Sequence, residues 1–415
     1  MSAAPVQPSS PGGLAMPLIL CAGVVLGLSM GIRHVQGLFM LPLLSEHGWG
    51  RSAFSFALGF QVLVWGFAQP LTGYLADRFG TARVIAAGCV LYAAGLMMES
   101  VAPTTLYLTL GAGLVIGLGL TATTFAVVYG ALSRRVPAEA RGTAQGLAGG
   151  VGGLIQFVLV PLSQLGIDTL GWSRTLQALA LVFLLSSATA WALNDRGRNS
   201  SAAPAAAPQP DASAGRVIRA AFGHSGFWLL NLGFVSCGFQ LAFLGAHLPA
   251  YLRDAGMTPS AGVNAIAIIA LANVVGTYAC GRLGDLYRRK FLLSGLYTVR
   301  TAAMLLFLAL PLSDASLYMF AAVMGATWLG TVPLTSGVVA QIFGVRYIGT
   351  LFGLVFLGHQ LGGFLGAWLG GLIYDATRSY ELMWFIAISL GVASIALNLP
   401  IRDRSVEHEL APAAA

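Results

Sequence analysis

Gly73-Tyr-Leu-Ala-Asp-Arg-Phe-Gly-Thr-Ala-Arg83 returns in outline as Gly281-Arg-Leu-Gly-Asp-Leu-Tyr-Arg-Arg-Lys290, at an offset of 281 − 73 = 208 residues. Both stretches read Gly-x-Leu-x-Asp followed by basic residues, and each follows a long apolar run. Two further matches lie at offsets of 349 − 142 = 207 and 375 − 168 = 207: Gly142-Thr-Ala-Gln-Gly146 with Gly349-Thr-Leu-Phe-Gly353, and Asp168 with Asp375. One period that recurs at separate places predicts two structurally equivalent halves.

The composition places those halves in a membrane. Of the 415 residues, 57% are hydrophobic and 9% are charged, and the mean hydropathy is +0.78. Soluble domains carry about 25% charged residues, so the outer surface of this chain must face lipid. The apolar runs are long and continuous, whereas a transmembrane β-barrel shows short alternating segments. We therefore predict an all-α membrane protein.

A bilayer core needs about 20 apolar residues per helix. We expect twelve transmembrane helices in two pseudo-symmetric six-helix bundles, at about 16–43, 53–75, 83–103, 105–132, 143–166, 173–193, 226–251, 262–283, 291–312, 315–340, 349–374 and 380–400. The long break is a Pro/Ala/Ser-rich linker. The predicted organisation is a tail (1–15), an N-terminal bundle (16–193), a cytoplasmic linker (194–225), a C-terminal bundle (226–401) and a tail (402–415).

The basic residues predict the orientation. With the N-terminus in the cytoplasm, 16 of the 22 Lys and Arg residues fall on the inner side, four fall outside, and Arg33 and Arg300 lie inside spans. This positive-inside bias predicts cytoplasmic termini in a bacterial inner membrane, and it explains the net charge of +7 without nucleic acid. The four cysteines lie in apolar runs without metal-ligand spacing, so we predict no metal and no cofactor.

The doubled loop, the layout of six plus six helices and the central linker resemble the major facilitator superfamily over almost the whole chain. Three stretches resemble its bacterial monocarboxylate porter and oxalate:formate antiporter branch. They are Gly31-Ile-Arg-His-Val-Gln-Gly-Leu-Phe39 with Gly48-Trp-Gly-Arg-Ser52, Gln69-Pro-Leu-Thr-Gly-Tyr-Leu-Ala-Asp-Arg-Phe-Gly80, and His247-Leu-Pro-Ala-Tyr-Leu-Arg-Asp-Ala-Gly256. The resemblance implies the major facilitator fold and a transporter rather than an enzyme.

The resemblance also implies that the repeated loops close the cytoplasmic side. This gating role maps onto Gly73, Asp77, Arg78, Arg83, Gly281, Asp285 and Arg289. Glycine permits the close approach of two helix ends, and a carboxylate facing a helix N-terminus gains about 1 kcal/mol in the one packing state that brings them together. The alternative is that the basic residues of these loops only set the topology.

Arg33 is the candidate that suggests the cargo. It lies about 17 residues, or about 25 Å, along the first span, where a charge costs about 2.5–3.5 kcal/mol. We expect no Asp or Glu well inside any span, so a protein partner is hard to find. Snorkelling to the membrane surface and a structural ion pair are alternatives. We interpret Arg33 as the binding group for an anionic substrate.

Further polar residues lie inside the spans. The candidate substrate-binding residues besides Arg33 are His34, His247, His359, Gln240, Asn273, Tyr129 and Gln156, and Arg300 is a possible buried cation. Each of them is also explained by helix packing. If a proton is co-transported, the histidines are its expected carriers. One departure from the branch is that residues 261–281, the eighth span, contain no arginine, so Arg33 takes its place or the substrate differs.

These observations predict a secondary active transporter of a small, monocarboxylate-like organic anion. Two rocking bundles would give alternating access, with proton symport or anion exchange as the driving force. The expected partners are the organic anion, protons if transport is proton-coupled, and the lipid bilayer, and we expect a functional monomer. Two alternatives remain, a drug or metabolite efflux carrier of the same fold and a transporter-like membrane sensor.

Overall fold

The computed structural model describes residues 15–136, 141–193, 212–343 and 348–404. These ranges contain twelve helical spans that are long and apolar enough to cross a bilayer, and no strand is found in them. The predicted all-α class and the twelve transmembrane helices are therefore confirmed.

The N-terminal bundle contains the first six spans. They are α1 (Ala15–His47), α2 (Arg51–Phe79), α3 (Thr81–Ser100), the run α4 (Thr105–Leu108), η1 (Thr109–Val115), α5 (Ile116–Thr123) and α6 (Phe125–Arg135), then α7 (Arg141–Leu170), and finally α8 (Trp172–Ser186) with η3 (Ser187–Leu193). The C-terminal bundle contains α10 (Ser225–Asp254), α11 (Pro259–Leu286), α12 (Arg289–Ala309), α13 (Asp314–Ala326), α14 (Thr331–Phe343), α15 (Ile348–Thr377) and α16 (Glu381–Asn398).

Two spans are interrupted where the sequence predicted continuous helices. The fourth span breaks at Thr124, whose backbone is extended between α5 and α6. The tenth span breaks between α13 and α14, after the C-cap residue Thr327. Such breaks are tolerated inside a membrane only where protein groups satisfy the freed backbone, so each one marks a place where side chains reach main-chain atoms.

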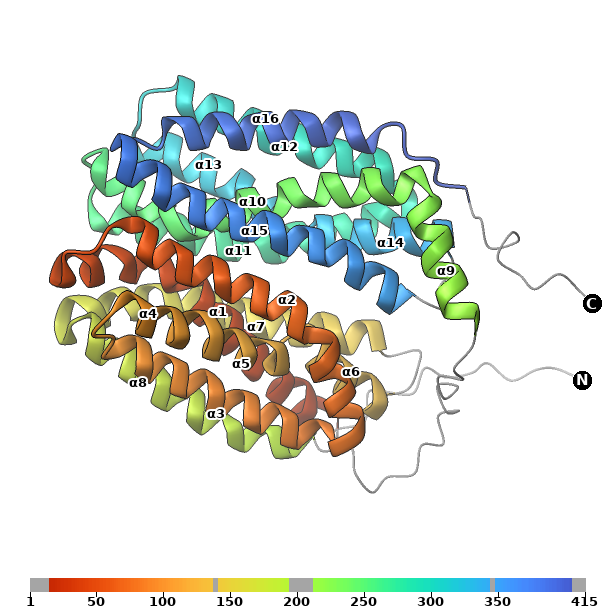
Figure 1. Cartoon of the computed structure of the whole chain (residues 1–415), viewed down its shortest axis with the longest axis horizontal. Coiled ribbons are helices and arrows are strands. Elements are labelled where there is room, and N and C mark those ends of the chain that lie inside the picture. The colour runs from red at the N-terminus through yellow and green to blue at the C-terminus, as the bar shows by residue number, and fades with distance from the viewer. Residues whose placement is uncertain (1–14, 137–140, 194–211, 344–347, 405–415) are drawn as a thin grey trace, which may run out of the picture.

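A short additional helix, α9 (Ala212–Gly223), lies in the region predicted to be linker. The remainder of that linker, residues 194–211, lies outside the described residues. Within the predicted linker, a short helix over residues 212–223 precedes α10 (Figure 1), and the linker bounds stay a prediction.

Each bundle has its own hydrophobic core, and Figure 1 shows the two bundles as separate layers. They meet along three helix pairs: α1 with α10, α2 with α15, and α7 with α11. Under the internal repeat, α1 corresponds to α10, while the pair α2–α15 corresponds to α11–α7. The contacts between the bundles therefore follow the pseudo-symmetry expected for two equivalent halves.

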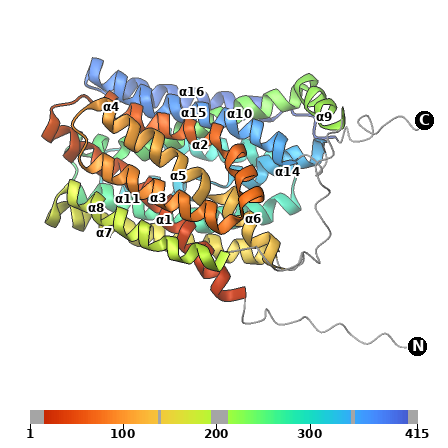
Figure 2. The ribbon, with the colours of Figure 1, turned by 60° about the horizontal axis from the view of Figure 1, so that its bottom comes forward.

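The bundles pack together at one end of the molecule. We call the end where α1 begins and α16 ends the terminal end, and the end where α2 begins and α15 ends the distal end (Figures 1 and 2). From the distal end inward, α2 touches α15 at Gly59 against Phe364 and at Gly66 against Gln360. Further along α2, Phe67, Leu71 and Tyr74 are exposed by 61%, 60% and 57%.

The terminal ends of facing helices are correspondingly open. A Cβ atom built on Gly73 of α2, on Gly281 of α11 or on Gly353 of α15 would meet no atom within 4 Å. The two bundles are thus joined at the distal end and separated at the terminal end.

Candidate substrate site and gates

Arg33 is a cation without a carboxylate partner in the part of the chain that the structure describes. Its Cζ lies 5.4 Å from the ring centroid of Trp65, the residue is half-buried, and its Nε is buried without a hydrogen-bond partner. Among the described residues it forms no ion pair. A guanidinium carries five N–H donors, so the group keeps its capacity to bind an acidic ligand.

The contacts of Trp65 place Arg33 at the boundary between the bundles. Its indole Nε1–H donates to Thr124 Oγ1 at 3.1 Å, at the break between α5 and α6. Its ring meets Phe356 of α15 edge-on, with centroids 5.8 Å apart. Because Phe356 belongs to the C-terminal bundle, the Arg33–Trp65 pair lies where the two halves meet.

His359 and His34 approach this boundary from different helices. The half-buried His359 ring stacks on Phe356 at 5.4 Å and 5°, and its Nδ1 lies 3.0 Å from Gln360 Oε1. His34 Nε2 donates to the Ile266 carbonyl of α11 at 3.3 Å. Arg33 and His34 are adjacent in α1. Arg33 therefore faces Trp65, which packs on Phe356, while His34 contacts α11 of the other bundle.

Tyr129 and Gln156 are half-buried. The Tyr129 ring packs on Phe125 at 5.5 Å, and its hydroxyl would lie 3.0 Å from a Cβ built on Gly149 of α7. Gln156 lies against α1, with its Cα 3.3 Å from a Cβ built on Gly31. Because residues two apart on a helix do not face each other, this contact places Gln156 against α1 but not beside the Arg33 side chain.

Arg300 is fully buried inside the C-terminal bundle. Its Nη2 donates to the carbonyls of Thr327 and Trp328 at the end of α13. Its Nη1 donates to Gln240 Oε1 at 3.3 Å and lies 3.4 Å from Cys237 Sγ. Arg300 therefore satisfies the main chain at the break in the tenth span, and it does not reach the headgroups by snorkelling.

Gln240 and Asn273 are also engaged within the C-terminal bundle. The Gln240 amide donates to the Ala387 carbonyl at 2.8 Å, which completes its bonding with Arg300. Asn273 Oδ1 accepts from the Leu329 N–H at 3.0 Å. Both side chains take part in helix–helix contacts, which is the alternative role that the sequence left open for them.

Glu99 is an acidic residue near the distal end of its span, where the sequence expectation of no Asp or Glu well inside a span still holds. This residue of α3 is fully buried, its Oε2 accepts from Gln36 Nε2 at 3.2 Å, and its Oε1 has no partner among the described residues. The burial of Glu99 could not be predicted from the sequence, because Glu99 is close to the end of an apolar run. It forms no ion pair with Arg33.

At the distal end an ion pair joins the two bundles. Arg51, the first residue of α2, donates from Nη1 and Nη2 to the two oxygens of Asp254, both at 2.7 Å. Its Nη1 also donates to the Tyr380 hydroxyl at 2.8 Å, and its Cζ lies 3.6 Å from the Tyr374 ring centroid. Two parallel N–H···O bonds are the strongest form of this pair.

Asp375, near the end of α15, caps the start of α2. Its two oxygens accept from the backbone N–H groups of Arg51 and Ser52, each at 2.8 Å. A carboxylate at a helix N-terminus satisfies unpaired donors and faces the positive end of the helix dipole. The approach requires glycine at 371, where a Cβ would lie 2.6 Å from Ser55 Oγ.

His247 is buried in the same network. Its Nδ1 lies 2.9 Å from the Tyr380 hydroxyl, and its Nε2 lies 2.8 Å from the Ala367 carbonyl and 3.2 Å from Ser55 Oγ. Burial raises the pKa of the Tyr380 hydroxyl above its ordinary value, so this hydroxyl keeps its proton. We call Arg51, Asp254, Asp375, His247 and Tyr380 the distal latch.

Of the distal latch, His247 was a candidate from the sequence, whereas Arg51, Asp254, Asp375 and Tyr380 were not, although two signals were visible. Arg51 lies in the stretch Gly48-Trp-Gly-Arg-Ser52, and Asp375 is one of the residues that define the internal repeat. Nothing local in the sequence joins these two regions, since they are 375 − 51 = 324 residues apart. The contact exists only because the bundles pack on each other.

The predicted gating residues lie at the terminal end, where the bundles are apart. Asp285 pairs with Arg289 of its own half at 3.7 Å. Arg78 donates to the Tyr74 hydroxyl at 3.2 Å, and Arg83 is exposed. Asp77 lies in α2, but its side chain is outside the described residues.

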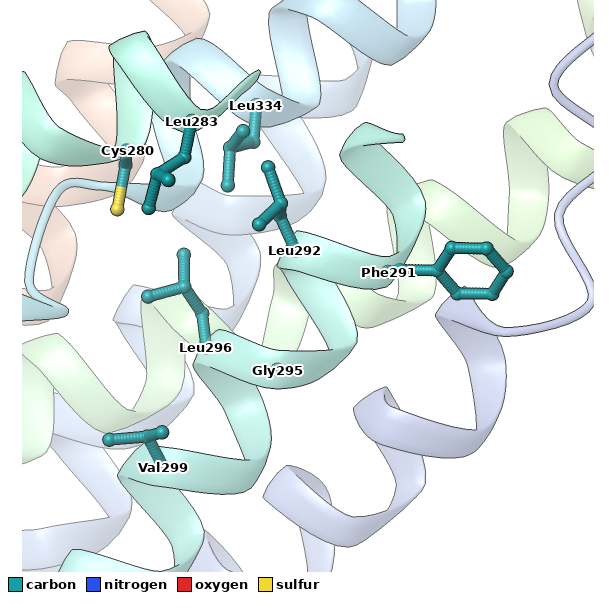
Figure 3. Close-up of a pocket in the computed structure, with 8 residues that line it drawn as sticks. All are labelled: Cys280, Leu283, Phe291, Leu292, Gly295, Leu296, Val299 and Leu334. Atoms are coloured by element: carbon teal, nitrogen blue, oxygen red, sulfur yellow. The ribbon is translucent and has the colours of Figure 1, made fainter. Parts of the chain in front are cut away.

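Two hollows on the C-terminal bundle have apolar walls. One of about 230 Å³ is lined by Cys280, Leu283, Phe291, Leu292, Gly295, Leu296, Val299 and Leu334 (Figure 3). A second, of about 280 Å³, lies between α12 and α13. Their walls include the exposed side chains of Phe291, Val299 and Met319, so they face lipid and provide no group for a carboxylate.

A bilayer-spanning fold of two six-helix bundles, with polar groups between them, defines a membrane transport protein. The family model of the Major Facilitator Superfamily matches residues 19–331 and 264–414. The chain belongs to this family: it is a multi-pass membrane transporter of small molecules and not an enzyme.

Individual relatives agree with this assignment. Monocarboxylate transporter 11 of Mus musculus is 29% identical over 409 residues, covering 95% of this chain and 90% of its own. The uncharacterized MFS-type transporter YcxA of Bacillus subtilis (strain 168) is 24% identical over 394 residues, covering 91% and 93%. The crystal structure of a mutant of the nucleoside transporter NupG has a TM-score of 0.77 at 14% identity, covering 94% and 100%.

A structure of known conformation is similar as well. The bacterial homologue of the human lysosomal transporter Spinster, in its inward-facing and unoccupied conformation, has a TM-score of 0.68 at 15% identity, covering 94% of this chain and 95% of its own. At these identities the likeness shows the shared fold alone.

Proposed function

We propose that this protein carries a small organic anion, of the monocarboxylate class, across the bacterial inner membrane by alternating access. The observation that carries the proposal is Arg33, a half-buried guanidinium without a carboxylate partner among the described residues. The similarity to monocarboxylate transporters supports the same substrate class. The substrate carboxylate would complete the charge balance of Arg33 on binding and restore its open coordination on release.

The positive-inside bias of the basic residues supports cytoplasmic termini. The terminal end would then face the cytoplasm, and the described structure would be an inward-facing state of a functional monomer. The bundles of residues 16–193 and 226–401 would rock about the Arg33–Trp65 boundary, with the terminal-end loops as the inner gate. Proton symport and anion exchange are both compatible with this cycle.

Uptake of a panel of labelled carboxylates into proteoliposomes tests the proposal, with and without a pH gradient. We expect Arg33→Ala to abolish uptake and Arg33→Lys to retain part of it, because a lysine keeps the charge but loses the bidentate geometry. Arg174→Ala is the matched control, since Arg174 is an exposed arginine. Uptake by Arg33→Ala equal to that of the control would refute the role of Arg33.

Glu99 favours a second candidate, an efflux carrier of cationic compounds. A buried carboxyl group with one unpartnered oxygen is the kind of group that binds a cation. Glu99 is fully enclosed, however, and bonded to Gln36, whereas Arg33 is half-buried. Transport of a cationic dye that is lost in Glu99→Gln and retained in Arg33→Ala would select this candidate.

A further inference from the structure

The hydrogen bonds of His247 in the distal latch have only one consistent direction. The Ala367 carbonyl can only accept, so His247 Nε2 carries the proton and donates to it at 2.8 Å. Nδ1 of the neutral ring must then accept, and its partner at 2.9 Å is the Tyr380 hydroxyl. The same hydroxyl accepts from Arg51 Nη1 at 2.8 Å.

The chain of donors therefore runs from Arg51 to Tyr380, from Tyr380 to His247, and from His247 to Ala367. The donor and the acceptor nitrogen of the neutral imidazole both have a partner. The ring is fully buried, and the chain passes from α2 of one bundle to α10 and α15 of the other. The hydrogen bonds of the closed distal end are thus those of a neutral His247.

A second proton on His247 disrupts these hydrogen bonds. It would place an N–H on Nδ1, facing the Tyr380 O–H that now donates to it, so the hydroxyl would lose its acceptor. The new positive charge would also lie in a network that already holds the Arg51 guanidinium. A buried hydroxyl left without an acceptor destabilises the closed distal end.

The carboxylates and the other tyrosines of the latch contact groups other than the imidazole. Asp254 is bound by Arg51 through both oxygens, and Asp375 accepts from the backbone N–H groups at the start of α2. Tyr251 and Tyr374 pack their rings against Tyr380. Within the described residues no carboxylate is bonded to the imidazole.

We propose that His247 is a proton-binding site whose occupation opens the distal latch. Separation of the bundles would remove Arg51 and Ser55 of α2 from this network. Water could then accept the Tyr380 O–H, so the separated state would take up the proton without leaving that group unsatisfied. Proton binding and distal opening therefore favour each other by linkage. In combination with the proposed anion transport, on which this coupling rests, an external proton would open the outer gate and admit the anion.

Spin labels on the two sides of the distal end test the latch without any substrate. Ser45→Cys at the end of α1 and Thr258→Cys before α11 are exposed positions in different bundles, in a background whose native cysteines are replaced. Electron–electron distance measurements from about pH 8 to about pH 5.5 span the ordinary histidine range. We expect the ratio of separated to joined molecules to rise as the pH falls, by at most about tenfold per pH unit for one proton.

Three variants make this test specific to His247. We expect His247→Gln to abolish the pH response and Tyr380→Phe to reduce it, because the closed state then no longer opposes the second proton. His47→Gln is the matched control, since His47 also lies at the distal end but bonds to the Leu43 carbonyl of its own helix, and it should respond like the parent protein. A full pH response in His247→Gln, or a parent distance that does not change with pH, would overturn the proposal.

The outcome is independent of the substrate assignment. If the distances respond to pH through His247 while no anion is carried, the proton site stands and the anion proposal fails. If anion uptake depends on Arg33 while the distances do not change with pH, the anion proposal stands and the proton site fails.

Discussion

At the scale of single residues, Arg33 depends on Trp65 for its position. The indole lies under the guanidinium at 5.4 Å and is itself held by Thr124 at 3.1 Å. A cation over an aromatic face is stabilised by about 0.5–2 kcal/mol, more when it is shielded from water. The aromatic face thus orients the donors of Arg33 without neutralising their charge, which leaves that charge for a ligand.

We expect Trp65→Leu to raise the KM for anion uptake by about 2- to 30-fold, because the cation–π contribution of about 0.5–2 kcal/mol is lost. The protein should still fold, since leucine fills part of the same space. Concentration-dependent uptake in proteoliposomes measures the change. Phe364→Leu, at the α2–α15 contact, is the control for aromatic loss elsewhere, and an equal effect in both variants would contradict a specific role of Trp65.

The sequence indicated that Arg33 is inside a span, but it could not reveal Trp65 as the neighbour. A charged residue inside an apolar run can be recognised from the sequence of that run alone. The residues around it come from other helices, which meet it only in the folded bundle. The same limit explains Arg300, whose partners Thr327 and Trp328 become available only because the tenth span breaks. It also explains His247, whose partners come from three different helices or turns.

At the scale of helices, the contact of Asp375 with the start of α2 is the inter-bundle cap of the distal latch. Its counterpart in the repeat, Asp168 at the end of α7, is exposed and bonded only to Gln164 of its own helix, at 2.8 Å. The sequence therefore predicted the equivalence of the two positions, while the packing gave only one of them a partner across the bundles.

We expect Asp375→Asn to weaken the closed distal end by about 1 kcal/mol, the usual size of a charge–dipole contact. The ratio of separated to joined molecules should then rise about fivefold at neutral pH. The spin-label pair at positions 45 and 258 measures this ratio. Asp168→Asn is the matched control and should leave it unchanged; an equal shift in both variants would rule out the cap.

A second contact at helix scale joins α12 to the segment after α16. Arg288 Nη2 donates to Asp403 Oδ1 at 2.5 Å, and Lys290 donates to the Ile401 carbonyl at 2.8 Å. The Arg288 guanidinium holds the pKa of the Asp403 carboxyl below its ordinary value, which is about 3.9. The carboxylate therefore stabilises the folded state above that ordinary value, and the stabilisation is lost as the pH falls through the lowered folded-state pKa.

We expect Asp403→Asn to lower the melting temperature by roughly 1 °C at neutral pH. The difference from the parent protein should persist at about pH 5 and disappear only below about pH 4. Thermal unfolding in detergent across this range measures it. Asp285→Asn, which removes a more exposed pair at 3.7 Å, should have the smaller effect, and a constant Asp403→Asn difference at all pH values would contradict the role of the carboxylate.

At the scale of the whole molecule, the repeat predicted two equivalent bundles but not the state in which they are found. Equivalent halves can join at either end with similar helix pairs, so the choice depends on the contacts that each end can make. In this structure the distal latch supplies an ion pair, a helix cap and a buried histidine, while Asp285 of the terminal-end loops pairs within its own bundle. The terminal-end residues would act only in the opposite state.

Gly73 allows that opposite state to be tested by itself. A side chain at this position meets no atom within 4 Å in the present state, so Gly73→Leu should fold with an unchanged melting temperature. When the terminal ends close, the same side chain would stand between helices that must approach closely, and uptake should fall by at least about tenfold, the effect of roughly 1.4 kcal/mol against the closed state. Gly295→Leu, which also has open space around its Cβ but lies in the lipid-facing hollow of Figure 3, should transport normally. Equal uptake by the two variants would mean that Gly73 is not at a closing interface, and that the terminal-end loops do not form the second gate.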